Sequence, residues 1–205
     1  MTHEAIEPDT KDWTWTVERQ CPECGFDASR IGAGELAAAV RDLTAPWPAR
    51  LSAEDAHRRP VPTIWSPLEY ACHIHEVLEV FRGRFELIAA EDNPALPNWD
   101  QDAAAIEGQY AAADPERIAR EIPERAEDLV GALAAFGAED AGGQDVQNPY
   151  ENAGEGDETT TKIGGGGWGR TAVRSDGATF TALTLGRYLL HDLAHHLHDV
   201  GLDPR

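Results

Sequence analysis

Two histidines near the C-terminus, His191 and His195, are four residues apart in a segment with helical periodicity. Residues at this spacing lie on one face of a helix with about 5 to 6 Å between their Cβ atoms, so two imidazoles can bind one ion. Rows of leucine flank the stripe on both sides, which indicates that it faces the protein interior. His196 lies about 140° around the helix from His191 and is the poorest candidate ligand.

A third histidine, His73, lies in a segment that predicts a helix over residues 67–90. His73 shares its helical face with aromatic and β-branched residues, whereas His75 shares its face with charged residues. We therefore expect His73 to point inward and His75 outward. Three neutral imidazoles from two facing helices leave coordination positions open, as in catalytic metal sites. Buried histidines that merely donate hydrogen bonds are the alternative interpretation.

The cysteines offer a weaker pattern. Residues 21–25 read CPECG, the spacing of half a zinc knuckle, but the sequence has no second cysteine pair to complete four ligands. A packed turn is the preferred interpretation, with a second metal site and a redox pair as alternatives. Cys72, next to His73, is expected to be a small buried side chain. Three cysteines cannot form a complete disulfide framework, which fits a reducing compartment.

Helical periodicity and capping signals predict an all-α protein. Ser66, Pro67 and Glu69 form the pattern of an N-cap followed by a capping box. We expect an extension at residues 1–29, one domain at residues 30–205 and no strands. Within that domain the sequence predicts helices at residues 34–51, 67–90, 102–112, 115–136 and 180–200, the longest four of which form a four-helix bundle.

A long glycine-rich segment, residues 137–178, precedes the last predicted helix and is interpreted as a loop. We expect rapid amide exchange in its central part, residues 140–166. Trp168, Arg170 and Arg174 are candidates to close over the metal site, and a plain surface loop is the alternative.

Composition excludes some classes of function. The formal net charge is −20, from 37 acidic and 17 basic residues, and such a chain repels nucleic-acid phosphates. No apolar run approaches the roughly 20 residues of a membrane span, and the first residues lack the apolar core of a signal peptide. We therefore expect a cytoplasmic protein that contacts neither nucleic acid nor membrane.

Several of these motifs occur together in one known family. Residues 65–73 read WSPLEYACH, with a tryptophan eight residues before a histidine, and residues 187–196 read RYLLHDLAHH, with a late HxxxH. Together with Trp13, Trp15 and the CPECGFD segment at residues 21–27, they resemble the actinobacterial branch of the DinB/YfiT-like superfamily. The resemblance covers nearly the whole chain.

The resemblance implies a four-helix bundle with zinc, nickel or another divalent ion at His73, His191 and His195. Because members often dimerise, it also implies a homodimer. Characterised relatives include S-transferases that depend on thiol cofactors and a maleylpyruvate isomerase that uses mycothiol. The leading hypothesis is therefore a thiol transferase or isomerase that uses a low-molecular-weight thiol such as mycothiol and acts on an electrophile. Many members of the superfamily have no known activity.

Other residues near the histidines take candidate roles in that reaction. Arg187, one turn before His191, could bind a carboxylate of substrate or cofactor, and Tyr188 could donate a proton. Two alternatives stay open. One is a metal-dependent hydrolase, for which Asp192 and Glu76 are weak candidates as general base. The other is a non-catalytic module that keeps the ion as a structural cross-link.

Overall fold

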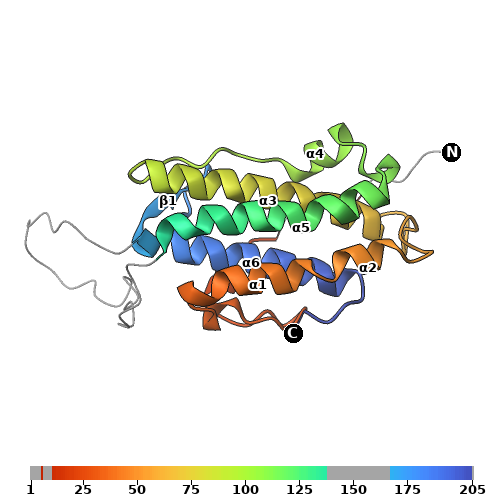
Figure 1. Ribbon diagram of the computed structural model, residues 1–205, viewed down its shortest axis with the longest axis horizontal. Coiled ribbons are helices and arrows are strands. Elements are labelled where there is room, and N and C mark those ends of the chain that lie inside the picture. Colours follow the sequence, from red (N-terminus) through yellow and green to blue (C-terminus); the bar gives the residue numbers. More distant parts are fainter. Residues whose placement is uncertain (1–5, 7–10, 138–166, 205) are drawn as a thin grey trace, which may run out of the picture.

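Four long helical segments lie side by side along the length of the protein (Figure 1). The computed structural model describes residues 6, 11–137 and 167–204. The first helical segment is made of two short helices in succession, α1 and α2, and the short α4 crosses one end. The helices are α1 (Leu36–Thr44), α2 (Trp47–Leu51), α3 (Pro67–Ala90), α4 (Gln101–Glu107), α5 (Pro115–Leu133) and α6 (Ala182–Asp199). The predicted all-α four-helix bundle is confirmed.

Helix α3 begins where its sequence predicts. The Ser66 hydroxyl accepts a hydrogen bond from the Glu69 amide at 3.3 Å, and the Glu69 carboxylate accepts one from the Ser66 amide at 2.8 Å. These reciprocal bonds satisfy amide groups that the first helical turn leaves without partners. The guanidinium of Arg59 binds the same carboxylate, with Nε 2.9 Å from Oε2. The start of the helix that carries His73 is thus fixed by a buried ion pair.

Two predicted helices are shorter or divided. The helix expected at residues 34–51 is interrupted between Thr44 and Trp47, because Pro46 has no amide hydrogen to continue the hydrogen-bond ladder. The helix expected at residues 102–112 ends at Glu107. Gln109 follows with a left-handed backbone, φ 49°, which starts a separate 3₁₀ turn.

The core lies between α3, α5, α6 and the α1–α2 segment. Helix α3 packs most extensively on α5, and α1 packs on both α5 and α6. At the crossing of α1 with α6, a Cβ at Gly186 would lie 2.9 Å from the Leu36 side chain, so a glycine allows this approach. The largest fully buried side chains come from all of these helices and include Trp47, Phe85, Ile122, Leu129 and Leu189. No helix among the described residues is long and apolar enough to span a membrane.

The structure corrects the prediction that residues 137–178 form only a loop. Strands β1 (Thr171–Val173) and β2 (Thr179–Thr181) pair antiparallel at one end of the bundle. Gly177, with φ 90°, provides the left-handed residue of the turn between them. Threonine and valine favour extended backbone, but strands of three residues are too short for a periodic signal in the sequence. Residues 140–166, where rapid exchange was expected, lie outside the described residues.

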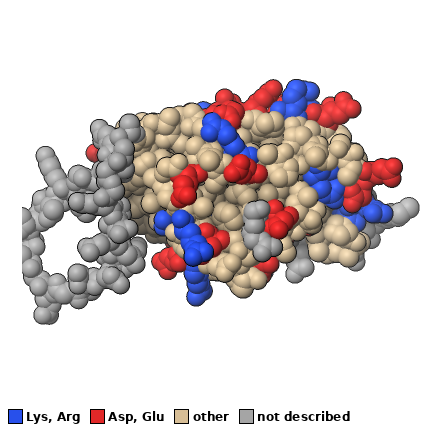
Figure 2. Space-filling model, turned by 60° about the horizontal axis from the view of Figure 1, so that its bottom comes forward, with Lys and Arg blue, Asp and Glu red and all other residues tan. Residues whose placement is uncertain are grey.

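The N-terminal extension lies against α6. Its 3₁₀ helix Thr14–Val17 contacts α6, as does a second 3₁₀ helix, Ala28–Arg30. The Arg187 Nε donates a hydrogen bond to the Ile31 carbonyl at 3.0 Å, which joins the end of the extension to the same helix. On the face drawn in Figure 2, acidic and basic side chains of the described residues are interspersed.

Candidate metal centres on α6

Helix α6 presents two pairs of metal-binding side chains at the same spacing. His191 and His195 form one pair, and Asp192 and His196 form the other, shifted by a single residue. A shift of one residue turns a helical position by about 100°, so the two pairs face different neighbours. Within the described residues, each pair completes a separate group of side chains that could hold an ion.

The first group, which we call the His73 cluster, consists of His73 from α3 with Asp192 and His196. One ligand atom from each residue lies within 4.8 Å of the others. His73 Nε2 is 3.7 Å from Asp192 Oδ2, and His196 Nε2 is 3.4 Å from Asp192 Oδ1. Two imidazoles and one carboxylate from two helices are the donor set of many mononuclear metal sites with open positions.

His73 is only 1% exposed, and neither of its ring nitrogens has a hydrogen-bond partner among the described residues. Its ring lies 5.4 Å from the ring of Trp65 and stacks on Trp99, also at 5.4 Å between centroids. A buried polar atom without a partner costs about 1–3 kcal/mol. A metal ion at Nε2 would remove part of this cost, so the donor set fits a divalent ion.

The surroundings of His196 also fit a metal site. His196 Nδ1 lies 2.8 Å from the Asp199 carboxylate, which fixes the ring and leaves Nε2 directed at Asp192. A carboxylate behind a ligand histidine is the usual arrangement around protein-bound metals. Burial opposes protonation of His196, but the hydrogen bonds to Asp192 and Asp199 raise its pKa to about 10, so an ion bound at Nε2 would have to displace a proton. Burial lowers the pKa of His73, so this ring is neutral and able to coordinate.

Asp192 is the anionic member of the cluster. Although burial favours its neutral form, the neighbouring His196 and His73 rings hold the pKa of its carboxyl well below the ordinary value. The carboxylate is therefore ionised and faces both imidazoles, as a metal ligand must.

A cavity of about 790 Å³ lies over both groups on α6. Asp192 and His196 line it, and His73 is buried behind them. Such a volume is typical of sites for small organic molecules. Aromatic side chains form much of the wall: Trp13, Trp65, Tyr70, Trp99 and Tyr188.

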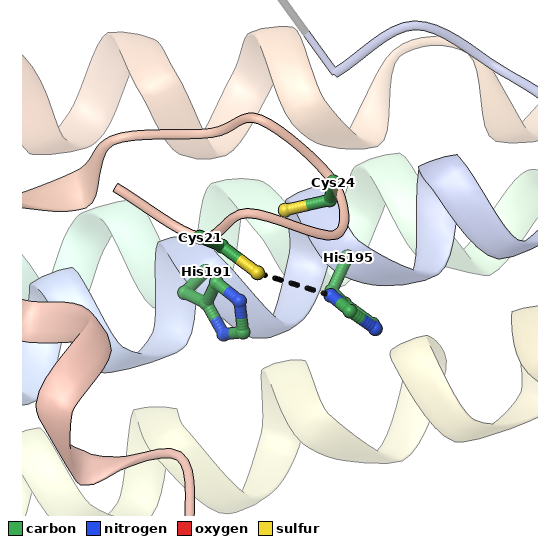
Figure 3. A group of neighbouring side chains, drawn as sticks. All are labelled: Cys21, Cys24, His191 and His195. Carbon is green, nitrogen blue, oxygen red and sulfur yellow. Dashed lines mark hydrogen bonds between the residues drawn. The ribbon is translucent and has the colours of Figure 1, made fainter. Parts of the chain in front are cut away.

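The second group, which we call the cysteine cluster, contains Cys21, Cys24, His191 and His195. One ligand atom from each residue lies within 4.8 Å of the others. Figure 3 shows the two cysteines on a turn of the extension, opposite the two histidines on α6. The Cys21 Sγ is 3.9 Å from His195 Nδ1. Burial, together with the neighbouring His195, lowers the pKa of His191 to about 4, so its ring is neutral.

The three histidines expected to share one ion are thus divided between the two groups. His73 belongs to the His73 cluster, whereas His191 and His195 belong to the cysteine cluster. A single site made of all three stays a prediction that the geometry does not favour. His196 was ranked lowest because the helical stripe was centred on His191. It lies instead beside His73, with ring centroids 4.8 Å apart.

The structure also corrects the expectation for His75. This residue is 7% exposed, because α5 covers the face that the sequence placed outside. Its Nε2 is 2.9 Å from the Glu121 carboxylate of α5. The charged residues on this helical face therefore did not indicate solvent exposure, because a charged residue of another helix packs against the same face.

The predicted catalytic residues lie in different surroundings. Tyr188 lines the cavity, and its hydroxyl accepts a hydrogen bond from Arg174 at 3.3 Å. Burial raises the pKa of Tyr188, so the phenol keeps its proton. Arg187 is not among the residues that line the cavity, and its Nε binds the Ile31 carbonyl. The roles predicted for these two residues stay predictions.

The candidate lid residues do not all approach the cavity. Trp168 packs against Phe136 with 5.3 Å between ring centroids, and Arg170 Nε donates to the Ile88 carbonyl at 2.7 Å. Both therefore join the β-hairpin region to the end of the bundle. Of the three, Arg174 comes nearest to the cavity through its contact with Tyr188. Glu76, a candidate base, lines a neighbouring cavity of about 390 Å³.

Comparisons with known proteins agree with this architecture. The model of a family described as the DinB superfamily matches residues 36–200. Among solved structures, the chain is similar to YfiT from Bacillus subtilis, described as a probable metal-dependent hydrolase with an unusual four-helix bundle topology. The TM-score is 0.60 and the sequence identity 14%, over 89% of this chain and 91% of that one. No curated protein matches the sequence. At this identity, the likeness to YfiT shows a shared fold.

Proposed function

The chain belongs to the DinB superfamily, and from this premise we propose that it is a metal-dependent enzyme whose ion is bound by His73, Asp192 and His196. The observation that carries the proposal is the buried His73 ring, whose two nitrogens have no hydrogen-bond partner among the described residues and which faces the Asp192 carboxylate at 3.7 Å. A divalent ion in such a site supplies Lewis acidity, which makes water or a thiol a stronger nucleophile at neutral pH.

Hydrolysis is the reaction that we favour. Three protein ligands leave open positions for water and substrate, and YfiT, which shares the fold, is described as a probable metal-dependent hydrolase. Tyr188 keeps its proton and lines the same cavity, so it is suited to donate a hydrogen bond or a proton to a leaving group. Asp199 positions the His196 ring from behind.

The cavity wall indicates the class of substrate. Its aromatic side chains favour a flat or apolar group, because aromatic surfaces bury such groups with favourable contacts. Acidic side chains also line the same cavity, at Asp100 and Asp102, whereas Glu23 is paired with Lys11 at 2.9 Å. They disfavour a strongly anionic substrate. We therefore infer an uncharged or cationic small molecule with an aromatic or apolar part, and no nucleic acid.

Thiol transfer at the same site is the second candidate. A cavity of about 790 Å³ has room for a low-molecular-weight thiol and an electrophile together. Mycothiol is the first thiol to test. Arg187, the expected anchor for an acidic group, is held by the Ile31 carbonyl, whereas Lys11 lines the cavity and Arg174 contacts Tyr188. Zinc and nickel are the ions to try first, and a homodimer stays a prediction.

Metal analysis of purified variants tests the site. His73→Ala, Asp192→Asn and His196→Ala should each weaken metal binding by more than the roughly 10- to 100-fold that loss of an outer-shell partner costs. His198→Ala is the matched control, because His198 lies exposed on the same helix. Turnover of ester and amide substrates, with and without mycothiol, should fall in parallel with metal content.

The two candidate reactions give different results in this experiment. Turnover without added thiol supports hydrolysis, whereas strict dependence on thiol supports transfer. Normal metal affinity and turnover in the Asp192→Asn and His196→Ala proteins would contradict the site itself.

A further inference from the structure

We propose that Cys21, Cys24, His191 and His195 bind a second ion, a structural zinc that joins the N-terminal extension to α6. This site goes beyond the proposed function and does not rest on it, because it uses none of the residues of the His73 cluster. The sequence offered only one cysteine pair. The structure supplies two histidines as the missing ligands.

The cysteine side of the site is a preformed turn. The Gly25 amide donates to the Cys21 carbonyl at 2.9 Å, and the Cys21 amide donates to the Phe26 carbonyl at 2.9 Å. Gly25 has φ 75°, a left-handed conformation that a residue with a side chain rarely adopts. The turn brings both sulfur atoms to the side that faces α6 (Figure 3).

On the histidine side of the site, one buried ring nitrogen has no hydrogen-bond partner among the described residues. His191 is 3% exposed, and its Nε2 has no hydrogen-bond partner among the described residues. His195 directs Nδ1 at the Cys21 sulfur at 3.9 Å, while its Nε2 lies 3.8 Å from Glu23 and 3.9 Å from Asp199. Carboxylates on the far side of a ligand histidine orient the ring and increase its basicity.

The spacing and the chemistry both fit zinc. Zinc–sulfur and zinc–nitrogen bonds of about 2.3 and 2.0 Å in a tetrahedron place neighbouring ligand atoms roughly 3.3 to 3.8 Å apart. The 3.9 Å between Cys21 Sγ and His195 Nδ1 is close to this range, and all four atoms lie within 4.8 Å of one another. Two thiolates and two imidazoles fill the tetrahedron, so the site is closed and structural rather than catalytic.

A disulfide or a packed turn explains less of the geometry. A Cys21–Cys24 disulfide would use two of the four side chains and leave His191 Nε2 buried without a partner. A packed turn would keep the hydrogen bond between Cys21 Sγ and His195 Nδ1 but would also leave His191 Nε2 buried without a partner. Bound zinc satisfies all four groups at once.

Such an ion would fix one wall of the cavity. The Trp13 ring lies 5.2 Å from the His191 ring and 4.8 Å from the His195 ring, so it covers the site from the extension. Trp13 and Glu23 also line the cavity over the His73 cluster. A cross-link between the extension and α6 would hold these two residues in place.

Cobalt substitution of the full chain tests the proposal directly. Cobalt bound to two thiolates gives sulfur-to-metal charge transfer in the near ultraviolet, which a site of histidine and carboxylate ligands does not. We expect this band in the wild-type protein and in His73→Ala, with one zinc ion bound at the cysteine cluster in each. Cys24→Ser and His191→Gln should lose the band and weaken zinc binding at least 100-fold.

Cys72→Ser is the matched control, because Cys72 is buried away from the cluster, and it should keep both the band and the zinc. If Cys24→Ser does not fold, the wild-type cobalt spectrum still decides the question. The proposal would be overturned if the wild-type protein showed no charge-transfer band, or if the freshly purified chain contained a Cys21–Cys24 disulfide. It would also be overturned if His73→Ala and His191→Gln each lost the same single ion while Cys24→Ser kept it. If the wild-type protein binds an ion at the cysteine cluster but none at the His73 cluster, the proposed function is contradicted and the zinc site is not.

Discussion

Replacing Arg59 with alanine should destabilise the protein, because it strands a buried charge at the start of α3. Glu69 is 3% exposed, and its carboxylate is bound by the Arg59 guanidinium and the Ser66 amide. Removing one partner of a buried ion pair costs about 3–5 kcal/mol. The Arg59 side chain is 28% exposed, so water can reach the vacated space. We therefore expect a loss near the lower end, about 3 kcal/mol.

The loss should depend on pH with a definite sign. Burial alone would raise the pKa of Glu69, but hydrogen bonds from Arg59 and Ser66 outweigh burial and hold the pKa below its ordinary value. In the wild-type protein the pair therefore stabilises above the unfolded pKa of Glu, and this contribution is lost as pH falls. In Arg59→Ala the effect of burial on the pKa of Glu69 dominates, so protonation of Glu69 removes the unpaired buried charge. The difference between variant and wild type should shrink as pH falls from 7.5 to 5.5.

Urea unfolding at several pH values measures this effect, with both proteins in the same metal-loaded state because bound metal adds to stability. The range stops well above the isoelectric point of about 4.6. At neutral pH the melting temperature should fall by about 6–12 °C. Arg58→Ala, an exposed neighbour, is the control, and Arg59→Ala/Glu69→Gln should recover most of the loss. Equal stability of the Arg58 and Arg59 variants, or a difference that does not change with pH, would refute the reasoning.

Two further substitutions test contacts of α6. Gly186→Ala should destabilise the protein by about 1–3 kcal/mol in chemical unfolding, because the new Cβ would lie 2.9 Å from the Leu36 side chain. This cost should exceed the gain from the higher helix propensity of alanine. A more stable variant would show that the Leu36 side chain moves aside. Arg187→Ala should cost about 1–2 kcal/mol through loss of the hydrogen bond to the Ile31 carbonyl, with unchanged metal content and KM. A raised KM with normal stability would instead support the carboxylate-binding role expected from the sequence.

The fold could be predicted because its signals are local. The capping box at Ser66 and Glu69 marks the start of α3, and the spacing of apolar residues gives the long helices. The division of the first helix follows from Pro46, which the sequence shows directly. The β-hairpin could not be predicted, since its two strands are held together by a pairing across a turn rather than by a periodic pattern.

The candidate site could be predicted only in part, because which side chains meet depends on how α6 is turned in the bundle. Periodicity correctly identified His73 as buried, and the structure places side chains that could hold an ion on α6. Periodicity could not decide which of two pairs, one residue apart, faces α3. The leucine rows that flank His191 suggested an inward direction, but the extension covers that side. The CPECG turn at residues 21–25 was the one signal that could have assigned His191 and His195 to a different partner.

The two proposed metal sites share structural support through one carboxylate. Asp199 Oδ2 is 2.8 Å from His196 Nδ1 of the His73 cluster, and Asp199 Oδ1 is 3.9 Å from His195 Nε2 of the cysteine cluster. One side chain thus orients a ligand of each proposed ion. Zinc at the cysteine cluster would withdraw charge from His195 and strengthen its attraction to Asp199, in competition with the contact of the same carboxylate with His196. Binding at one site should therefore alter affinity at the other by the same factor in both directions, as linkage requires.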